Sequence, residues 1–356
     1  MLAFAVTVLR PAPSVSLHAL PRPALPKPPT IHAPAWSAAY DGALLTGQDL
    51  STPRPTGSTV KLLTALVVVA DPSLPPTRVI TVSAQEALAA AVGARRGDSE
   101  LPLVPGERLT VHDLMLALLL PSGDDAADLL AAHAAGGTRA FLSRMDALAL
   151  RLHLGWSRFN DPSGLSAQDR ITAAGAIRLA TAALKSPRIA AIVRLRTARL
   201  SDGQVLRNLN QLLFTYPGAI GMKTGYTIAA GHNLIFAARS AGATLAGSVL
   251  HEADFQTTFA DAAQILDYDR RAGSARTLPA GTVVATVRWP FGLHQTLRLE
   301  SPLFLGPEGA PRPRVQLGSA TLLSRGGAVG TVRAAGASAA VAAAGLPRWL
   351  QIWRSL

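Results

Sequence analysis

Ser58 and Lys61 stand three residues apart, directly before a long apolar run, Leu62–Val69. A run of this length after Gly57-Ser58 predicts a buried helix with the serine in its first turn, although its three valines leave a strand possible. In a helix, residues three apart share a face, so the Lys61 amine can reach the Ser58 hydroxyl. A serine hydroxyl needs a base to remove its proton, and backbone N–H groups at a helix start can stabilise an oxyanion. The pair therefore predicts a nucleophile with a neighbouring base.

The use of basic residues favours lysine as that base. The chain contains 30 arginines and only four lysines, Lys27, Lys61, Lys185 and Lys223. A buried lysine can lose its proton, whereas arginine stays charged. Taken alone, a serine and a lysine at this spacing form a weak signal, and an incidental pair is the alternative until other parts of a site are found.

The composition limits the class of protein. With 356 residues, of which 49% are hydrophobic, the chain can bury a large core and a second, smaller domain. It has no cysteine, which excludes disulfides and thiolate metal sites but decides nothing about the compartment. The net charge of +12 favours anionic surroundings, yet the arginines are scattered, so a solvated basic surface is favoured over a nucleic-acid module. The eight histidines show no H-E-x-x-H or other metal-ligand spacing.

Changes in composition divide the chain into four segments. Residues 1–35 form an apolar start, which could be the remnant of a signal peptide beginning upstream, and a proline-rich extended linker. Residues 36–272 form the main domain, and residues 273–335 contain short strand-like runs between Gly and Pro turns, which predict a small all-β domain. Residues 336–356 form an Ala-rich and amphipathic tail, which could be an interfacial membrane anchor or could pack on the β domain.

Several elements of the main domain follow from local patterns. A hairpin is predicted around Asp41-Gly42, and a buried helix is predicted to start after Thr110 as its N-cap and to stop at Pro121. The acids Asp125 and Asp128 in the helix that follows are interpreted as capping residues. A second hairpin over residues 233–250 places Lys223-Thr224-Gly225 at a strand edge, and residues 254–270 form an amphipathic helix packed on this sheet.

Three pieces then stand in order along the chain: Ser58-Thr59-Val60-Lys61, Ser122-Gly123-Asp124 and Lys223-Thr224-Gly225. Motifs of the form S-x-x-K, S-D-N and K-T-G are those of penicillin-binding proteins and class A β-lactamases. Together with Asp161-Pro162-Ser163-Gly164-Leu165 and Tyr216-Pro217-Gly218, roughly residues 40–270 resemble the serine-type D-alanyl-D-alanine carboxypeptidases, the low-molecular-mass penicillin-binding proteins of peptidase family S11.

This resemblance implies an α+β fold. Its catalytic domain is β-lactamase/transpeptidase-like, with an antiparallel sheet, helices on both faces and a helical subdomain, followed by a small all-β domain. It also implies an exported enzyme of the periplasm or cell envelope, either free or associated with a membrane. The enzyme would remove the terminal D-alanine from peptidoglycan stem pentapeptides without a cofactor, and β-lactam antibiotics would be covalent inhibitors.

The resemblance also implies a role for each motif residue. Lys61, kept uncharged by burial and by the neighbouring cation Lys223, would take the proton of Ser58. The backbone N–H groups of Ser58 and Tyr226 would hold the oxyanion, and Ser122 would relay a proton to the departing D-alanine. The substrate would be bound by a group of residues on the strand and at the second motif: Lys223, Thr224, Gly225, Tyr226 and Asp124.

Two residues depart from the family pattern. The third residue of the second motif is normally asparagine, and here it is Asp124, a carboxylate that only accepts hydrogen bonds. Its charge opposes the role of Lys61 as a free base unless Asp124 is protonated or paired with Lys223. Many members carry an arginine before the last helix of the catalytic domain, where this chain has Thr258. Two alternatives therefore stay open: a catalytically weak or silent relative that binds peptidoglycan, and a β-lactamase or esterase of the same fold.

Overall fold

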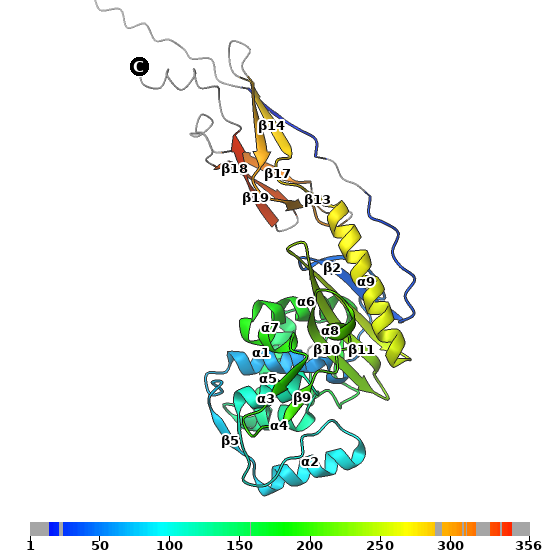
Figure 1. Ribbon diagram of the computed structural model, residues 1–356, viewed down its shortest axis with the longest axis vertical. Coiled ribbons are helices and arrows are strands. Elements are labelled where there is room, and N and C mark those ends of the chain that lie inside the picture. Colours follow the sequence, from blue (N-terminus) through cyan, green and yellow to red (C-terminus); the bar gives the residue numbers. More distant parts are fainter. Residues whose placement is uncertain are drawn as a thin grey trace, which may run out of the picture. The chain divides into compact units, whose positions relative to one another are not determined.

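The computed structural model describes residues 14–20, 24–156, 158–288, 294–307, 310, 312–317, 328–334 and 337–343 (Figure 1). The chain divides into two compact units. The larger comprises Lys27–Arg271, and the smaller combines Met1–Pro26 with Ala272–Leu356. Each unit has its own apolar core.

The larger unit contains a five-stranded antiparallel sheet. Its strand order is β10-β11-β12-β2-β3, so β10 is an edge strand. The strands are β2 (Ala35–Tyr40), β3 (Ala43–Gln48), β10 (Ala219–Thr227), β11 (Gly231–Ser240) and β12 (Ala243–Glu252). The two predicted hairpins are thus confirmed, and Lys223-Thr224-Gly225 lies on the edge strand as expected.

Helices form the rest of this unit. They are α1 (Lys61–Ala70), α2 (Ala84–Arg96), α3 (Val111–Leu119), α4 (Asp124–Ala132), α5 (Gly137–Arg151), α6 (Ala173–Lys185), α7 (Pro187–Val193), α8 (Leu212–Thr215) and α9 (Phe255–Ala275). A 3₁₀ turn, η1 (Gly57–Val60), precedes α1. Three pairs of short strands connect the helices: β4 (Arg54–Pro55) with β7 (Arg170–Ile171), β5 (Val79–Thr81) with β6 (Arg108–Thr110), and β8 (Thr197–Arg199) with β9 (Val205–Arg207).

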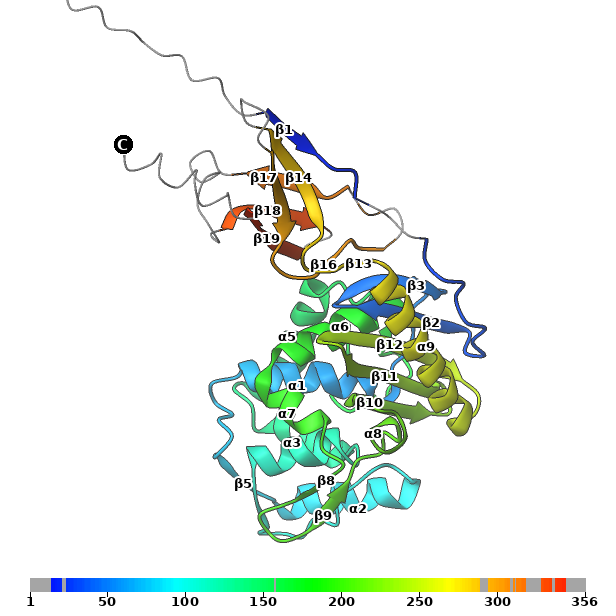
Figure 2. The ribbon, with the colours of Figure 1, turned by 45° about the horizontal axis from the view of Figure 1, so that its top comes forward.

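The sheet has a helix on each face. Helix α6 packs against β2 and β12, and α9 runs along the sheet on the opposite side (Figure 2). Alternation along β11 explains this, because Ile235 and Ala237 join the helical core while Leu234 and Phe236 are buried on the other face. Helix α1 is almost wholly buried, as its unbroken apolar sequence requires.

The N-cap of α3 agrees with the prediction. The Thr110 hydroxyl accepts a hydrogen bond from Asp113 N, and the Asp113 carboxylate accepts from Thr110 N, which closes a capping box. The carboxylate also accepts from Ser201 N and Oγ. The helix that leads into the second motif is therefore fixed at its start.

The smaller unit is a six-stranded antiparallel sheet in the order β1-β14-β15-β19-β18-β17. Its strands are β1 (Ser14–Leu17), β14 (Val283–Arg288), β15 (His294–Leu299), β17 (Arg314–Leu317), β18 (Ala328–Ala334) and β19 (Ala337–Ala343), with a separate pair formed by β13 (Thr277–Leu278) and β16 (Leu303–Phe304). A β-rich unit after residue 272 was expected.

Two expectations about this unit need correction. The proline-rich segment is not all linker, because Ser14–Leu17 pairs with β14; no proline falls within these four residues, so every backbone N–H is available. The tail does not begin at 336, because Ala337–Ala343 forms β19, in which Ala339 and Val341 are buried in the core. The tryptophan-containing tail and the apolar start at residues 1–9 lie outside the described residues. Among the described helices, none combines the length and apolarity required to cross a bilayer.

Candidate active site

Ser58 lies in η1, directly before α1. The Lys61 Nζ atom donates a hydrogen bond to Ser58 Oγ at 2.8 Å, and the lysine side chain is fully buried. A 3₁₀ turn eclipses residues three apart, so the two side chains leave the chain in the same direction. The predicted pairing of these two side chains is therefore present, in a tighter turn than the α-helix expected.

The Lys61 amine has two further partners. It contacts Asp124 Oδ1 at 2.5 Å, and it donates to the backbone oxygen of Ser163 at 2.8 Å. An ammonium carries three protons, and the three acceptors around Nζ match that number. The Lys61 amine therefore has three oxygen partners, one of which is a carboxylate oxygen.

The loop that supplies the Ser163 oxygen is locked by Asp161. Its Oδ1 accepts hydrogen bonds from Ser163 N and Gly164 N, both within 2.7 Å. Gly164 has φ +92°, and a Cβ there would lie 2.1 Å from the backbone oxygen of Gly57, so only glycine lets this loop touch η1. The contact between this loop and Lys61 could not be predicted from the sequence, because a backbone oxygen is the same in every residue.

Asp124 connects Lys61 to a second loop. Its Oδ2 accepts a hydrogen bond from Ser99 N at 3.0 Å, while its own N–H donates to Ser99 O at 2.6 Å. Both carboxylate oxygens are thus occupied by donors. Ser122, two residues earlier, is buried with φ +75° and lines the same open cleft as Ser58 and Asp124. The role of Ser99 could not be seen in the sequence, for the same reason as Ser163.

Lys223 brings a second amine to this buried site. Only 1% of the residue is exposed, and its Nζ donates to Thr224 O at 2.9 Å. Burial lowers the pKa of Lys223 well below the usual lysine value, and the positive charge of Lys61 lowers it further, while Asp124 acts in the opposite direction. From the sequence we expected Lys61 to be the uncharged amine beside a charged Lys223. In the structure Asp124 pairs with Lys61, while Lys223 donates to a backbone oxygen.

Gly225 allows β10 to approach η1. A Cβ at this position would lie 2.9 Å from Ser58 N and 2.8 Å from Thr59 N, and a Cβ on Gly57 would lie 3.1 Å from Tyr226 N. The side chain of Asn233, on the next strand, donates to the backbone oxygens of Pro55 and Thr56 and ties the sheet to the segment before η1. The backbone around Ser58 and Tyr226 is therefore packed closely together.

An open cleft of about 910 Å³ lies above these residues. Six of the eight predicted site residues line it: Ser58, Ser122, Asp124, Thr224, Gly225 and Tyr226. Lys61 and Lys223 are buried and do not line it. Thr258 also lines the cleft, and its hydroxyl donates to Asp254 O. The cleft therefore brings the Ser58 hydroxyl together with residues of β10, and the amine of Lys61 contacts this hydroxyl.

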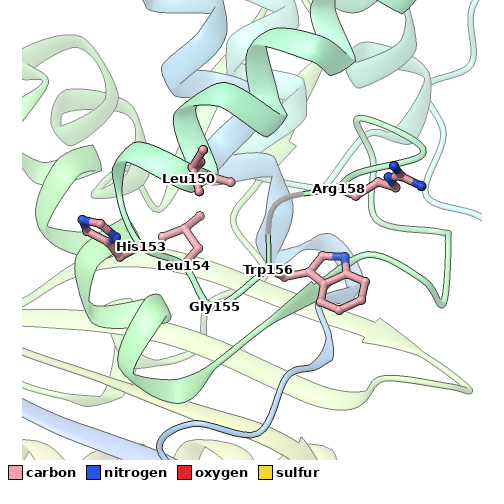
Figure 3. Close-up of a pocket in the computed structure, with 7 residues that line it drawn as sticks. Leu150, His153, Leu154, Gly155, Trp156 and Arg158 are labelled. Atoms are coloured by element: carbon pink, nitrogen blue, oxygen red, sulfur yellow. The ribbon is translucent and has the colours of Figure 1, made fainter.

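A second hollow lies at the C-terminal end of α5 (Figure 3). It has a volume of about 530 Å³ and is lined by Ala149, Leu150, His153, Leu154, Gly155, Trp156 and Arg158. None of the predicted site residues is in it. Across the described residues, no three His, Cys, Asp or Glu side chains are arranged to hold a metal ion.

Carboxyl groups with raised pKa values lie beside Asp124. Burial raises the pKa of Asp125 to about 7 and that of Asp128 to about 6, with the negative charge of Asp124 adding to both. Burial and the neighbouring Asp125 raise the pKa of Glu100 to about 8. Asp125 does more than the expected capping: Oδ1 accepts from Ala126 N, and Oδ2 holds Leu101 N at 2.7 Å.

Comparisons with known proteins agree with these features. A family model described as D-alanyl-D-alanine carboxypeptidase, peptidase family S11, matches residues 24–254. A D-alanyl-D-alanine carboxypeptidase of Streptomyces sp. is 32% identical over 271 residues, which cover 71% of this chain and 92% of that protein. One from Mycobacterium tuberculosis is 34% identical, covering 62% of this chain and 75% of that one. The crystal structure of a Streptomyces DD-transpeptidase superposes with a TM-score of 0.62 at 30% identity, over 68% of this chain and 99% of the other.

The carboxyl cluster makes stability depend on pH. Because the pKa of Glu100 is raised on folding, the folded protein binds more protons than the unfolded chain between about pH 4.5 and 8. We expect the free energy of unfolding to fall as pH rises through this range, and Glu100→Gln to flatten the slope. The change should be well under the about 1.4 kcal/mol per pH unit of one fully coupled proton, since the carboxyl group is partly exposed.

Urea unfolding at a series of pH values measures this slope. The glutamine keeps an acceptor for Asp125 N, which Glu100 Oε2 holds at 2.8 Å. Glu107→Gln is the matched control, because Glu107 also accepts a backbone N–H, that of Val104, in the adjoining loop. An equal slope in wild type and Glu100→Gln would contradict the assignment.

Proposed function

Since the chain belongs to peptidase family S11, the D-alanyl-D-alanine carboxypeptidases, we propose that its cleft removes the terminal D-alanine of peptidoglycan stem peptides through an acyl-enzyme on Ser58. The protein is a serine-type hydrolase of this family. The observation that carries the residue assignment is the 2.8 Å contact between Lys61 Nζ and Ser58 Oγ in a buried setting. It places the Lys61 amine, once uncharged, where it can accept the proton of the Ser58 hydroxyl.

Acylation requires Lys61 to give up one proton first. An ammonium with three donated hydrogen bonds has no lone pair with which to accept the Ser58 proton. The Asp124 carboxylate, at 2.5 Å, favours the charged amine and opposes this loss, so the proton leaves to solvent. Once Lys61 is uncharged, it takes the proton of Ser58 while Oγ attacks the carbonyl carbon of the D-Ala-D-Ala amide.

The oxyanion then forms between η1 and β10. The proposed donors are the backbone N–H groups of Ser58 and Tyr226. Their assignment is supported by the close packing of Gly57 and Gly225 at this point, which brings strand and turn within van der Waals distance. Preorganised backbone donors of this kind stabilise charge that develops in the transition state.

The leaving group is handled on the other side of Ser58. We assign to Ser122 the relay of a proton to the departing D-alanine nitrogen, and to Lys223 and Thr224 the binding of its carboxylate. An incoming carboxylate favours the charged form of Lys223, whose pKa is low in the empty site, so substrate binding and proton uptake are coupled. Water then hydrolyses the ester on Ser58 and releases the shortened peptide.

Partners and location follow from this chemistry. The family acts in the cell envelope, where peptidoglycan stem peptides are found, and a β-lactam presents a reactive amide to the same serine. We further propose contact of the C-terminal tail with a membrane surface, through Trp349 and Trp353 beside two arginines, a pattern typical of interfacial helices. These residues lie outside the described part of the chain.

The alternatives from the sequence gain no support. All the relatives named above carry carboxypeptidase or transpeptidase names. Asp124 stands where the family normally has asparagine, and this difference suggested a silent relative. Lys61 and Ser58 are nevertheless in contact.

The role of Lys61 is tested by replacing it with a cation that cannot lose its proton. We expect Lys61→Arg to slow acylation by a fluorescent penicillin by about 10²- to 10⁴-fold, the usual contribution of a general base. Lys185→Arg, on an exposed lysine at the end of α6, is the matched control and should leave the rate unchanged.

The same assay assigns the nucleophile. Ser58→Ala should remove labelling and D-alanine release together, while Ser143→Ala, an exposed serine on α5, should keep both. Wild-type protein that is neither labelled nor releases D-alanine would support the silent relative. Rapid turnover of the β-lactam without a stable adduct would support the β-lactamase.

The role of Asp124 is tested by replacing it with asparagine. The single oxygen of an asparagine at this position can take over the hydrogen bond from Ser99 N. Its NH₂ group can then donate to the lone pair of an uncharged Lys61, which a carboxylate cannot do. We expect Asp124→Asn to raise the acylation rate at neutral pH, by about tenfold if the lost ion pair favoured the charged amine by about 1.4 kcal/mol.

Stopped-flow acylation measures this change. Asp124→Ala is the control, because it leaves Ser99 N without an acceptor and should acylate more slowly than the asparagine variant. An unchanged or lower rate in Asp124→Asn would show that the carboxylate is tolerated or required.

A further inference from the structure

A charged loop forms part of the cleft wall beyond the motif residues. It begins at Arg96, the last residue of α2, continues through Gly97, Asp98 and Ser99, and lines the cleft that contains Ser58. We infer that Arg96 and Asp98 recognise the side chain of the residue that precedes D-Ala-D-Ala, and that they favour one ending in both a carboxylate and an ammonium. This inference rests on the proposed function.

The loop is held in a fixed place. Gly97 ends α2 in the left-handed region at φ +91°, and Asp98 N donates back to Gly93 O at 3.1 Å. The next residue, Ser99, makes two hydrogen bonds with Asp124, one in each direction. The loop is therefore fastened to the residue that contacts Lys61, and its position relative to Ser58 is set by that contact.

The two charges of this loop are available to a ligand. Within the described part of the chain, neither the Arg96 nor the Asp98 side chain makes a hydrogen bond or an ion pair, with each other or with a third residue. The other charged groups of the site are engaged: Lys61 with Asp124, and Lys223 with Thr224 O. A solvated arginine at a helix end is common, but the adjacent Arg95 is equally exposed and does not line the cleft.

The proposed substrate limits which groups can contact Arg96 and Asp98. Its terminal carboxylate is assigned to Lys223 and Thr224, and the two D-alanine side chains are methyl groups. The residue before them is the one whose side chain can bear charge. A side chain with a carboxylate and an ammonium satisfies Arg96 and Asp98 together. One with an ammonium alone satisfies Asp98 and faces Arg96 with a like charge, and a neutral one engages neither.

Three acetylated tripeptides ending in D-Ala-D-Ala test this. The side chain of the first residue differs among them. In the first peptide it carries an ammonium and a carboxylate. In the second the carboxylate is converted to a neutral amide, and in the third the amine is acetylated as well, so that the side chain is neutral. The kcat/KM for D-alanine release is measured for each peptide with the full chain. We expect the first to be the best substrate and Arg96→Gln to lower its advantage over the second by about two- to fivefold, the effect of one exposed ion pair.

Asp98→Asn should lower kcat/KM for both ammonium peptides by a similar factor and leave the neutral peptide unchanged. Arg95→Gln is the matched control and should change nothing. Raising the salt concentration should reduce the wild-type preference, because the contacts are exposed.

Each other result has a definite meaning. Equal kcat/KM values for the three peptides in wild type would overturn this inference and leave the proposed function standing. An equal loss on all three in Arg96→Gln would show that Arg96 binds the terminal carboxylate, which also overturns it. Absence of D-alanine release from every peptide would overturn the proposed function itself, and the inference with it.

Discussion

Two lysine amines and one carboxylate are buried close together in the larger unit, and only one of these amines has the carboxylate as its partner. Lys61 contacts Asp124, and Lys223 has a backbone oxygen. Two ammonium groups in a setting of low polarity repel each other, and each loses hydration energy. Burial and the positive charge of Lys61 therefore lower the pKa of Lys223. The segments around Lys61 hold its amine against Ser58 Oγ.

The segments that meet at Lys61 come from distant parts of the chain. The turn η1 supplies Ser58, the start of α4 supplies Asp124, and the loop after α5 supplies the Ser163 oxygen. Each segment is fixed by its own local device: the 3₁₀ turn, the reciprocal bonds with Ser99, and the Asp161 carboxylate that holds two backbone N–H groups. The aspartate at position 124 has a physical consequence here, because two acceptor oxygens allow it to bind the amine and the Ser99 loop at once. An asparagine would have one acceptor for two donors unless the amine were uncharged.

The sequence alone was sufficient for the elements with strong local patterns. The apolar run after Lys61, the Thr110 cap and the hairpin of β11 and β12 occur where they were predicted, because a helix face, a cap and a tight turn are encoded by adjacent residues. The edge position of Lys223-Thr224-Gly225 followed from the same hairpin. The sequence could not give β1, since its partner β14 lies about 270 residues away, nor β19, whose small alanines carry little strand signal. The contacts of Ser163 O and Ser99 N were also out of reach, because backbone groups are the same in every residue.

The charge state of the two lysines could not be predicted from local sequence, since it depends on which amine meets the carboxylate in space. NMR titration of lysine side chains labelled with ¹³C at Cε measures it directly, and only four lysines contribute signals. The signal that disappears in Lys223→Arg identifies Lys223. Our account predicts that this signal titrates well below the usual lysine pKa of 10.5. Titration of Lys223 at or above that value would contradict it.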